Sequence, residues 1–311
     1  MTARIPAAAL VARTRRVSAA TRLRARWPVA VLRTARPRQW PKNLLVFAAP
    51  LAGSSFGRDG GFGYALVAAA VFCLASVAVY FTNDVVDADR DRRHPAKRHR
   101  PVASGELPEA HAVALAAVAA GAAEGVSFWI GEPLLAATAG CYLALSLLYS
   151  LVLKHIPVIE LVFVASGFVL RVLGGAVATH VPPSAWFLVV CSLGALLVAT
   201  AKRFAELAVL GSAAARHRPS MRWYSPAVLR AAQRCIAAVM IIAYLLWAVG
   251  ESPAWAMGWH VASTLPLAAA LARFDWLAAR KISTPVEDLI ARDVPMVCLE
   301  FSWLAMFMIG L

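Results

Sequence analysis

The sequence lacks the cysteine and histidine patterns that hold zinc or form disulfides. Its five cysteines are far apart, and each lies in an apolar run with no CxxC and no Cys/His ligand spacing. The seven histidines are scattered, without an HxxxH pair. We therefore interpret the cysteines as small buried hydrophobic residues, and we predict neither a zinc site nor a disulfide.

The N-terminal region lacks acidic residues and a long apolar run. Residues 1–42 hold eleven Lys and Arg and no Asp or Glu. The longest apolar stretch there, Pro6–Ala12, is too short and too interrupted for the apolar region of a secretory signal peptide. We interpret residues 1–35 as a basic cytoplasmic extension, disordered or lying on the membrane, and residues 36–311 as a folded intramembrane domain.

Acidic residues are also scarce overall, because 31 Lys and Arg stand against 17 Asp and Glu, for a net charge of +14. A nucleic-acid partner would require basic residues that share a surface with exposed aromatics, or a recognisable binding module. The basic residues instead fall in short clusters between apolar stretches, and 60% of the chain is hydrophobic. This composition favours a membrane protein and argues against nucleic acid as a partner.

Apolar segments recur along the chain at lengths that suit membrane-spanning helices of about 20 residues. Helix-stopping combinations separate three pairs of them, at Gly131–Pro133, Val181–Pro183 and Glu251–Pro253. The sequence therefore predicts an all-α fold, a polytopic membrane bundle of about nine transmembrane helices. The predicted spans are Leu44–Phe56 (with an interfacial turn over Arg38–Asn43), Phe62–Thr82, Ala110–Ile130, Leu134–Leu153, Val158–Thr179, Ser184–Ala201, Ala232–Gly250, Ala254–Ala272 and Val294–Leu311.

The distribution of positive charge predicts how these spans are oriented. With the N-terminus inside, 29 of the 31 Lys and Arg fall on inner segments, one (Arg58) on an outer segment and one (Arg171) within a span. This asymmetry follows the positive-inside rule. We expect a multi-pass protein of the inner (plasma) membrane, with the longest loops and most polar residues on the cytoplasmic side.

Three aspartates follow the second predicted span with helical spacing. Asp84, Asp87 and Asp91 stand at i, i+3 and i+7, so a continuing helix places them on one face, while Asp89 points away. Clustered carboxylates repel one another, and Mg²⁺ relieves this while leaving coordination sites for phosphate oxygens and water. The spacing favours a Mg²⁺ site over the alternative, a solvated acidic loop neutralised by its neighbouring arginines.

A dense basic stretch comes directly after the aspartates, from His94 to Pro101. Lys97, Arg98 and Arg100 could bind phosphate oxygens. The same residues also suit a loop that only fixes topology by its positive charge. The sequence leaves both interpretations open.

The NDxxDxxxD motif at Asn83–Asp91, followed by this basic loop and Pro-x-x-Ser-Gly at Pro101–Gly105, resembles the UbiA-type intramembrane prenyltransferase superfamily. The resemblance covers about residues 36–311. It implies a nine-helix bundle around a central cavity that opens toward the membrane, with Asp-rich motifs on two inner loops.

The second motif departs from that pattern. Aromatic prenyltransferases of the superfamily carry a carboxylate-rich motif after the sixth span, whereas this chain has Lys202, Arg203 and Glu206 there. Direct cationic donors would neutralise phosphate in place of a second coordinated metal. This suits a donor with an additional phosphate, such as phosphoribosyl pyrophosphate, although Lys202 and Glu206 could also simply pair with each other.

Further segments resemble the decaprenyl-phosphate phosphoribosyltransferase branch of the superfamily, and their occurrence in order is more specific than any one of them. Glu160 stands where that branch leads us to expect Asp. The resembling segments are Arg36–Asn43, Tyr149-Ser150 with Leu153-Lys154, and Gly167–Arg171 with Gly174–Ala176.

Individual basic residues have ordinary alternatives to a substrate-binding role. Lys42 and Lys154 lie at predicted inner helix ends, where lysines commonly reach for the interface, and the resemblance raises phosphate binding as the rival explanation. Arg171 lies about three turns into a span, which is costly unless it faces a polar cavity or a partner. Glu160 shares its face and could help to position it.

We therefore predict that residues 36–311 form a Mg²⁺-dependent pentosyltransferase. It would transfer 5-phosphoribosyl from phosphoribosyl pyrophosphate to decaprenyl or another polyprenyl phosphate, releasing pyrophosphate, for arabinan precursors of the cell envelope. Asp84, Asp87 and Asp91 would be catalytic and would bind the metal together with Asn83. The predicted substrate-binding residues are Lys42, Asn83, Arg98, Arg100, Tyr149, Lys154, Glu160, Arg171, Lys202, Arg203 and Glu206.

Two other functions stay open at this point. An aromatic prenyltransferase would use a polyprenyl diphosphate donor and share the first Asp motif, but it would lack its second one. A transporter or lipid-binding protein would place polar residues along a path between both faces, whereas here they gather on the inner side. The sequence does not fix the oligomeric state, and it is compatible with a homo-oligomer.

Overall fold

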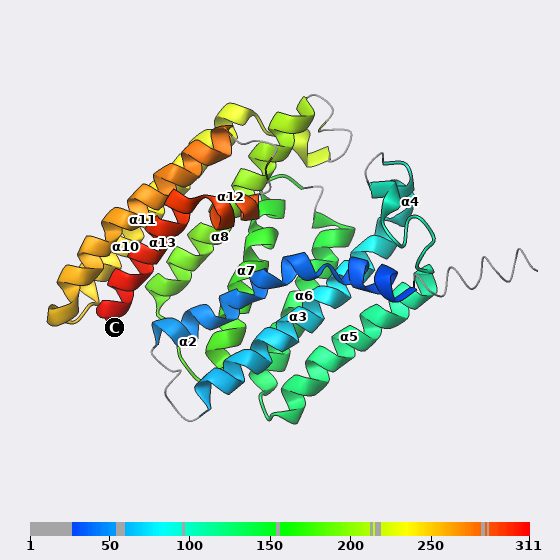
Figure 1. Cartoon of the computed structure of the whole chain (residues 1–311), viewed down its shortest axis with the longest axis horizontal. Helices are drawn as coiled ribbons and strands as arrows, with labels where there is room; N and C mark the ends of the chain where they lie inside the picture. Colours follow the sequence, from blue (N-terminus) through cyan, green and yellow to red (C-terminus); the bar gives the residue numbers. More distant parts are fainter. Residues whose placement is uncertain are drawn as a thin grey trace, which may run out of the picture.

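The structure is a computed structural model. It describes residues 27–53, 60–94, 97–153, 156–211, 214, 219–280, 284 and 286–311. Within these ranges every regular element is helical and no strand occurs, which confirms the predicted all-α class. Figure 1 shows long helices packed side by side, with α5 at one edge of the molecule and α10, α11 and α13 at the other.

The helices begin and end close to the predicted breaks. Gly131–Pro133, Val181–Pro183 and Glu251–Pro253 all fall at or between helix ends, and Gly131 has a positive φ of 77°. The elements after residues 27–35, which are also helical, are η1 (Pro37–Phe47), α2 (Ala48–Ala52), α3 (Gly61–Val86), α4 (Ala88–Arg92), η3 (Lys97–His99), α5 (Glu109–Trp129), α6 (Pro133–Leu151), α7 (Ile159–Ala178), α8 (Ala185–Leu210), η6 (Pro219–Trp223), α10 (Pro226–Gly250), α11 (Ala254–Arg280), α12 (Val286–Arg292) and α13 (Val294–Ile309).

Six of the described helices, α3, α5, α6, α7, α8 and α10, are long and apolar enough to cross a membrane. α11 covers the eighth predicted span, and α13 is a shorter apolar helix of 16 residues at the ninth. The multi-pass helical membrane fold is thus confirmed, whereas the total of nine transmembrane helices stays a prediction.

The first predicted span differs in its local geometry. Its described part is a 3₁₀ helix of 11 residues, η1, followed by the short α2. Pro37 occupies the first turn and Pro41 lies inside the helix, where it removes a backbone donor. The tighter helix accommodates these prolines, and a regular α-helix does not form until Ala48.

Helix α8 extends well beyond the predicted end of its span at Ala201. It continues without interruption to Leu210, so Lys202, Arg203 and Glu206 lie on a helix and not in a loop. These residue types are good helix formers, and their charge alone suggested that the helix had ended. The rigid extension fixes the direction in which the three side chains project.

Two adjacent glycines of α7 allow two neighbouring elements to pack closely against it. A Cβ atom at Gly175 would lie 1.8 Å from the carbonyl oxygen of Val46 in η1, and one at Gly174 would lie 2.1 Å from the ring of Phe72 in α3. Small residues allow helix backbones to approach each other closely in membranes. Gly175 therefore lets η1, which carries Lys42 and Asn43, lie directly against α7, while Gly174 makes room for Phe72.

Part of the segment assigned to the basic extension is packed. In helix 27–35, Ala30, Thr34 and Ala35 are buried, and the two alanines join an apolar cluster with Phe81 and Leu107. This helix thus leads directly into the bundle near the end of α3.

Candidate active site

The Asp-rich segment lies where α3 passes into α4. Asp84 and Asp91 are 2% and 3% exposed, and one nitrogen, Nη1 of Arg100, lies 3.4 Å from the Asp84 carboxylate and 2.7 Å from that of Asp91. Arg36 also donates to Asp84. The i, i+7 spacing therefore brings two buried carboxylates together between two arginines, and we call these four residues the Asp-rich cluster.

The remaining two aspartates differ from these in exposure. Asp87 lies at the junction of α3 and α4, is 26% exposed and pairs with Arg90 at 3.3 Å. Asp89 is 86% exposed and pairs with Arg92. The predicted outward direction of Asp89 is thus observed, while Asp87 borders the cluster from the solvent side.

No group of three or more His, Cys, Asp or Glu side chains with metal-binding geometry occurs among the described residues. The carboxylates of Asp84 and Asp91 are instead neutralised by Arg36 and Arg100. Magnesium sites, however, commonly use only one or two carboxylates and take their other oxygens from phosphate and water. The donor set present here fits such a site, provided that phosphate competes for the arginines.

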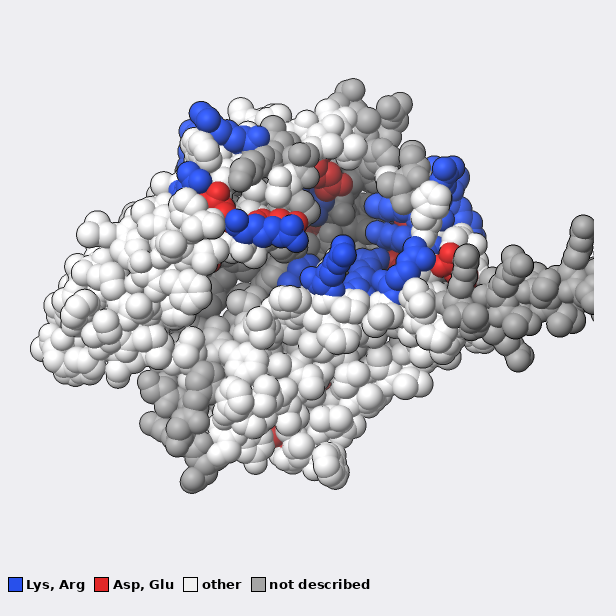
Figure 2. Space-filling model, viewed as in Figure 1, with Lys and Arg blue, Asp and Glu red and all other residues white. Residues whose placement is uncertain are grey.

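Basic side chains from other elements face this cluster. Figure 2 shows Lys and Arg gathered around a hollow on this side of the molecule, with acidic side chains within it. Burial lowers the pKa of Lys97 in η3, and Arg100 lowers it further, while Asp91, Asp87 and Glu206 act to raise it. Because Glu206 on α8 affects Lys97, the basic loop and the end of α8 lie near each other.

Three charged residues, Lys202, Arg203 and Glu206, lie toward the C-terminal end of α8. Arg203 is 8% exposed and pairs with Glu206 one turn later. Its Nε atom is buried and has no hydrogen-bond partner among the described residues. Lys202 lies over the ring of Phe168, with its nitrogen 5.9 Å from the ring centre. The buried Nε of Arg203 is thus a cationic donor that the described residues leave unsatisfied.

Asn83 and Ser150 connect α3 to the inner end of α6. The Ser150 hydroxyl donates to the Asn83 side-chain oxygen, and Ser150 is buried. This contact fixes the Asn83 amide one residue before Asp84. Tyr149, the neighbour of Ser150, is partly buried on the same helix.

Arg171 lies deeper in the bundle, and neutral groups bind it. Its Nε donates to Asn43 at 2.7 Å, Nη1 to the Gly167 carbonyl at 2.6 Å, and Nη2 to Ser76 and Tyr142, both at 3.0 Å. We call these residues the Arg171 cluster. The cluster joins η1, α3, α6 and α7, and no carboxylate pairs with Arg171 among the described residues.

Glu160 lies on the same helix as Arg171 but is engaged elsewhere. It is fully buried at the start of α7, where its carboxylate accepts from Ser220 at 3.0 Å and from Tyr224. At 1.5 Å per residue it lies roughly 16 Å from Arg171 along the helix. The hypothesis that Glu160 positions Arg171 directly therefore finds no support, since Glu160 attaches the η6 segment to α7.

Tyr224 also supports a strained backbone position. Its hydroxyl accepts from the backbone N–H of Val158 at 2.7 Å, and Val158 has a positive φ of 65°, unusual for a β-branched residue. Burial raises the pKa of the Tyr224 hydroxyl, and Glu160 raises it further, whereas the Val158 bond and Arg203 lower it. The start of α7 is thus held in place by this tyrosine.

Three predicted substrate-binding residues lie apart from these clusters or outside the description. Lys42 on η1 donates to Gln39 at 3.3 Å. Arg98 is exposed, and its Nε contacts the neighbouring His99. Lys154 lies outside the described residues.

Sequence reasoning missed Arg36 and Ser150 as site residues. Arg36 has a left-handed backbone (φ 51°) directly before Pro37, and its guanidinium lies 5.2 Å from the ring centre of Tyr80. A basic residue at the inner end of the first span was the signal available for it. Ser150 gave only a weak signal, as the neighbour of Tyr149.

The fold and this site define a multi-pass intramembrane protein in which carboxylates and cationic donors gather at one end of the helices. Residues 44–286 match the UbiA prenyltransferase family, and the chain belongs to that family. The resemblance found in the Asp-rich motif is thereby confirmed.

Curated relatives extend the similarity over most of the chain. A decaprenyl-phosphate phosphoribosyltransferase of Mycolicibacterium smegmatis is 36% identical over 288 residues, covering 88% of this chain and 90% of the relative. One from Corynebacterium glutamicum is 37% identical and covers 78% and 75%. The nodulation protein NoeC of Azorhizobium caulinodans is 34% identical over 55% of each chain.

Solved structures support the fold. A UbiA homologue from Archaeoglobus fulgidus bound to GPP and Mg²⁺ aligns with a TM-score of 0.67 at 16% identity, covering 89% of this chain and 99% of that one. The structure of digeranylgeranylglyceryl phosphate synthase has a TM-score of 0.65 at 15% identity. At these identities the likeness concerns the arrangement of helices.

Proposed function

We propose that the protein transfers the 5-phosphoribosyl group of phosphoribosyl pyrophosphate to decaprenyl or another polyprenyl phosphate, with release of pyrophosphate. The observation that carries this proposal is the cationic pair on α8. Lys202 and Arg203 stand where aromatic prenyltransferases bear a second carboxylate motif, on the same helix as Glu206, whose charge acts on Lys97. The similarity, over most of the chain, to enzymes named for this reaction supports it.

The Asp-rich cluster would bind the diphosphate end of the donor. Asp84, Asp87 and Asp91 would hold Mg²⁺, with Asn83 orienting the site through its bond to Ser150. The bound ion would supply charge neutralisation to the leaving diphosphate. Phosphate oxygens would draw Arg36 and Arg100 away from the carboxylates, since charge-assisted bonds to phosphate are of comparable strength.

The reaction needs no strong general base. The acceptor phosphate is already anionic, and its oxygen attacks the anomeric carbon while the C–O bond to diphosphate breaks, with the electron pair leaving on pyrophosphate. Catalysis then depends on positioning and on stabilising the developing charge, to which Lys202 and Arg203 would contribute. Attack opposite the leaving group inverts the anomeric carbon.

The other predicted residues would bind the substrates or shape the cavity. Lys42, Arg98, Tyr149 and Lys154 would contact phosphate or ribose groups, and Glu206 would set the position of Arg203. The neutral partners of Arg171 and the engagement of Glu160 with η6 favour roles in holding the cavity walls. The polyprenyl chain would lie among Phe163, Phe168 and neighbouring small residues, entering from lipid.

The active site would face the cytoplasm of the inner (plasma) membrane. The positive-inside rule supports this orientation, because the basic segments and the Asp-rich cluster lie at the same end of the bundle. In the cell, the product would serve as a precursor for arabinan of the envelope, as the resemblance implies.

One assay tests the reaction. Purified full-length protein with Mg²⁺, labelled phosphoribosyl pyrophosphate and decaprenyl phosphate should give a labelled lipid, and chelation of the metal should prevent it. Asp87→Asn should abolish this Mg²⁺-dependent product while leaving the thermal unfolding midpoint close to that of the parent. Failure to label the lipid, together with turnover of a prenyl diphosphate and an aromatic acid, would replace this proposal with aromatic prenyl transfer.

A further inference from the structure

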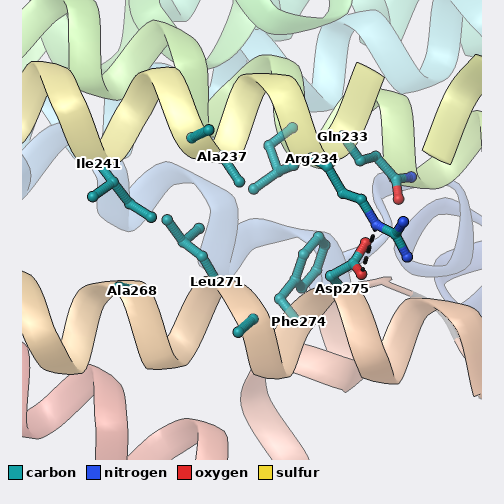
Figure 3. A pocket seen from close by; sticks show the side chains of 11 residues that line it. Gln233, Arg234, Ala237, Ile241, Ala268, Leu271, Phe274 and Asp275 are labelled. Carbon is teal, nitrogen blue, oxygen red and sulfur yellow. Dashed lines mark hydrogen bonds and ion pairs between the residues drawn. The ribbon is translucent and has the colours of Figure 1, made fainter. Parts of the chain in front are cut away.

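A pocket of about 300 Å³ lies between α8, α10 and α11, and no residue of the candidate active site lines it. α10 and α11 are antiparallel here, so that Ile241 lies opposite Ala268 at one end and Arg234 opposite Asp275 at the other (Figure 3). Between these ends the walls are apolar, with Ala237 and Leu271 facing each other across the pocket. The volume is at the small end of the range for ligand sites.

A buried amide without partners lines this pocket. Gln233 is 2% exposed, and neither its Nε2 nor its Oε1 has a hydrogen-bond partner among the described residues. Burying an amide in this way costs free energy unless a ligand or water completes its bonds. Gln233 therefore points to a polar group that occupies this end of the pocket.

The same end carries a net positive charge. Asp275 accepts from Arg230 at 2.9 Å and from Arg234 at 3.4 Å through one carboxylate oxygen, so two arginines share one acidic partner. Arg234 keeps 67% of its side chain exposed at the mouth. The other oxygen of Asp275, Oδ1, is buried without a hydrogen-bond partner among the described residues, so this end also calls for a donor. The charges and the two unpartnered side chains together suit a phosphate beside Gln233 and Arg234 whose head group also carries hydroxyl donors, as in phosphatidylglycerol.

The apolar part opens toward the membrane-facing surface. Ala238 on α10 and Ala272 on α11 line opposite sides of the pocket, and both are exposed. Val239 and Ile242, which follow Ala238 on α10, are exposed too. Small side chains along the rim leave room for a chain to enter sideways. The pocket thus matches the polarity of an amphiphile. It is apolar along most of its length and cationic at the end where Gln233 and Arg234 lie.

We propose that this pocket binds an anionic phospholipid, with one acyl chain between α10 and α11 and its phosphate beside Gln233 and Arg234. Basic pockets between transmembrane helices are suited to acidic lipid head groups. A polyprenyl phosphate shares this chemistry, but its phosphate must reach the Asp-rich cluster, with which the pocket has no residue in common. The proposal does not depend on the transferase reaction.

Binding is measured by native mass spectrometry of the full-length protein, titrated in detergent with phosphatidylglycerol or phosphatidylcholine. We expect one retained phosphatidylglycerol and weaker retention of phosphatidylcholine. Ala238→Phe fills the rim and should weaken phosphatidylglycerol binding about tenfold. Val228→Phe places the same side chain at an exposed position on another face of α10, outside the pocket, and it should leave binding unchanged.

Gln233→Leu separates a ligand role from a structural one. Without lipid, this variant should melt at or above the parent's midpoint, because a buried amide without partners is removed. Its thermal shift with phosphatidylglycerol should nevertheless shrink. A lower midpoint without lipid, combined with an unchanged lipid shift, would show that Gln233 only supports packing.

Three outcomes would overturn the proposal. Equal phosphatidylglycerol binding by the parent and Ala238→Phe would place the lipid elsewhere. Displacement of phosphatidylglycerol by decaprenyl phosphate, at concentrations that support turnover, would assign the pocket to the acceptor. A change of oligomeric state in Ala238→Phe, without any retained lipid in the parent, would assign this face to a second copy of the chain.

Discussion

The Asp-rich cluster and the Arg171 cluster both hold arginine within a membrane protein, but they compensate its charge differently. Arg36 and Arg100, which are partly exposed, pair with buried carboxylates at the C-terminal end of α3 and in α4. Arg171 binds only neutral oxygens and an aromatic face among the described residues, with its guanidinium 4.6 Å from the ring centre of Tyr142. Ion pairs can be exchanged for phosphate and a metal, whereas the Arg171 contacts hold four elements in fixed positions.

The largest expected effect concerns the carboxylates. Asp91→Asn should lower the turnover number at least about a hundredfold, because charge that stabilises the transition state is typically worth that much. Asp89→Asn, an exposed aspartate two residues away, should stay within about twofold, since such surface pairs contribute little. Transfer of labelled phosphoribosyl to decaprenyl phosphate measures both variants, and equal losses would remove Asp91 from the site.

Arg171→Lys should act on stability and not on chemistry. Lysine cannot reproduce the planar set of bonds to Asn43, Gly167, Ser76 and Tyr142, and the groups left unsatisfied should cost about 2 kcal/mol of unfolding free energy. Thermal unfolding in detergent measures this loss, while turnover per folded molecule should change little. An unchanged midpoint with a raised KM for the lipid would instead make Arg171 a substrate-binding residue.

Arg100→Lys makes the same substitution in the Asp-rich cluster, and the opposite pattern is expected. A lysine retains the charge but cannot reproduce the fork of donors, so the KM for phosphoribosyl pyrophosphate should rise about tenfold. The melting midpoint should move less than in Arg171→Lys, because the site is open to water. If both variants lost stability to the same extent, the contrast between the clusters would fail.

The smallest effect is expected at the start of α7. Tyr224→Phe leaves the Val158 N–H without its acceptor and should cost about 1 kcal/mol of unfolding free energy. Ser220→Ala, which removes the other donor to Glu160, should have a similar effect. Chemical denaturation measures both, and a loss of activity without loss of stability would indicate that this segment touches substrate.

The positions of the helix breaks, and the fact that Asp84 and Asp91 lie on one helix face, could be predicted because both depend on residues close together in the sequence. Proline and glycine ended the helices at the three predicted breaks, and Asp84 and Asp91 share a face because they are two turns apart. The extension of α8 from Ala201 to Leu210 was not predicted. Its charged residues end the apolar pattern by which a membrane span is recognised, but they do not end the helix. Pro41 lies inside η1, where its ring and its missing N–H disfavour a regular α-helix, but the apolar pattern does not reveal which helix type forms instead.

Long-range pairing could not be derived from the sequence. Arg36 and Asp84 are 48 residues apart, and only the packing of helix 27–35 and η1 beside α3 brings them together. The pocket beside Gln233 depends on which alanines of α10 and α11 face each other across the two helices. No periodicity distinguishes such alanines from those that simply pack.

The contact of Gly175 with Val46 affects how inactive variants are interpreted. Any side chain at Gly175 would meet the Val46 carbonyl and displace η1, and with it Lys42 and Asn43. A genetic screen for loss of function would therefore score Gly175 together with the aspartates, although it touches no substrate. Abundance and activity must be recorded separately for each variant before a sensitive position in this chain is assigned to chemistry.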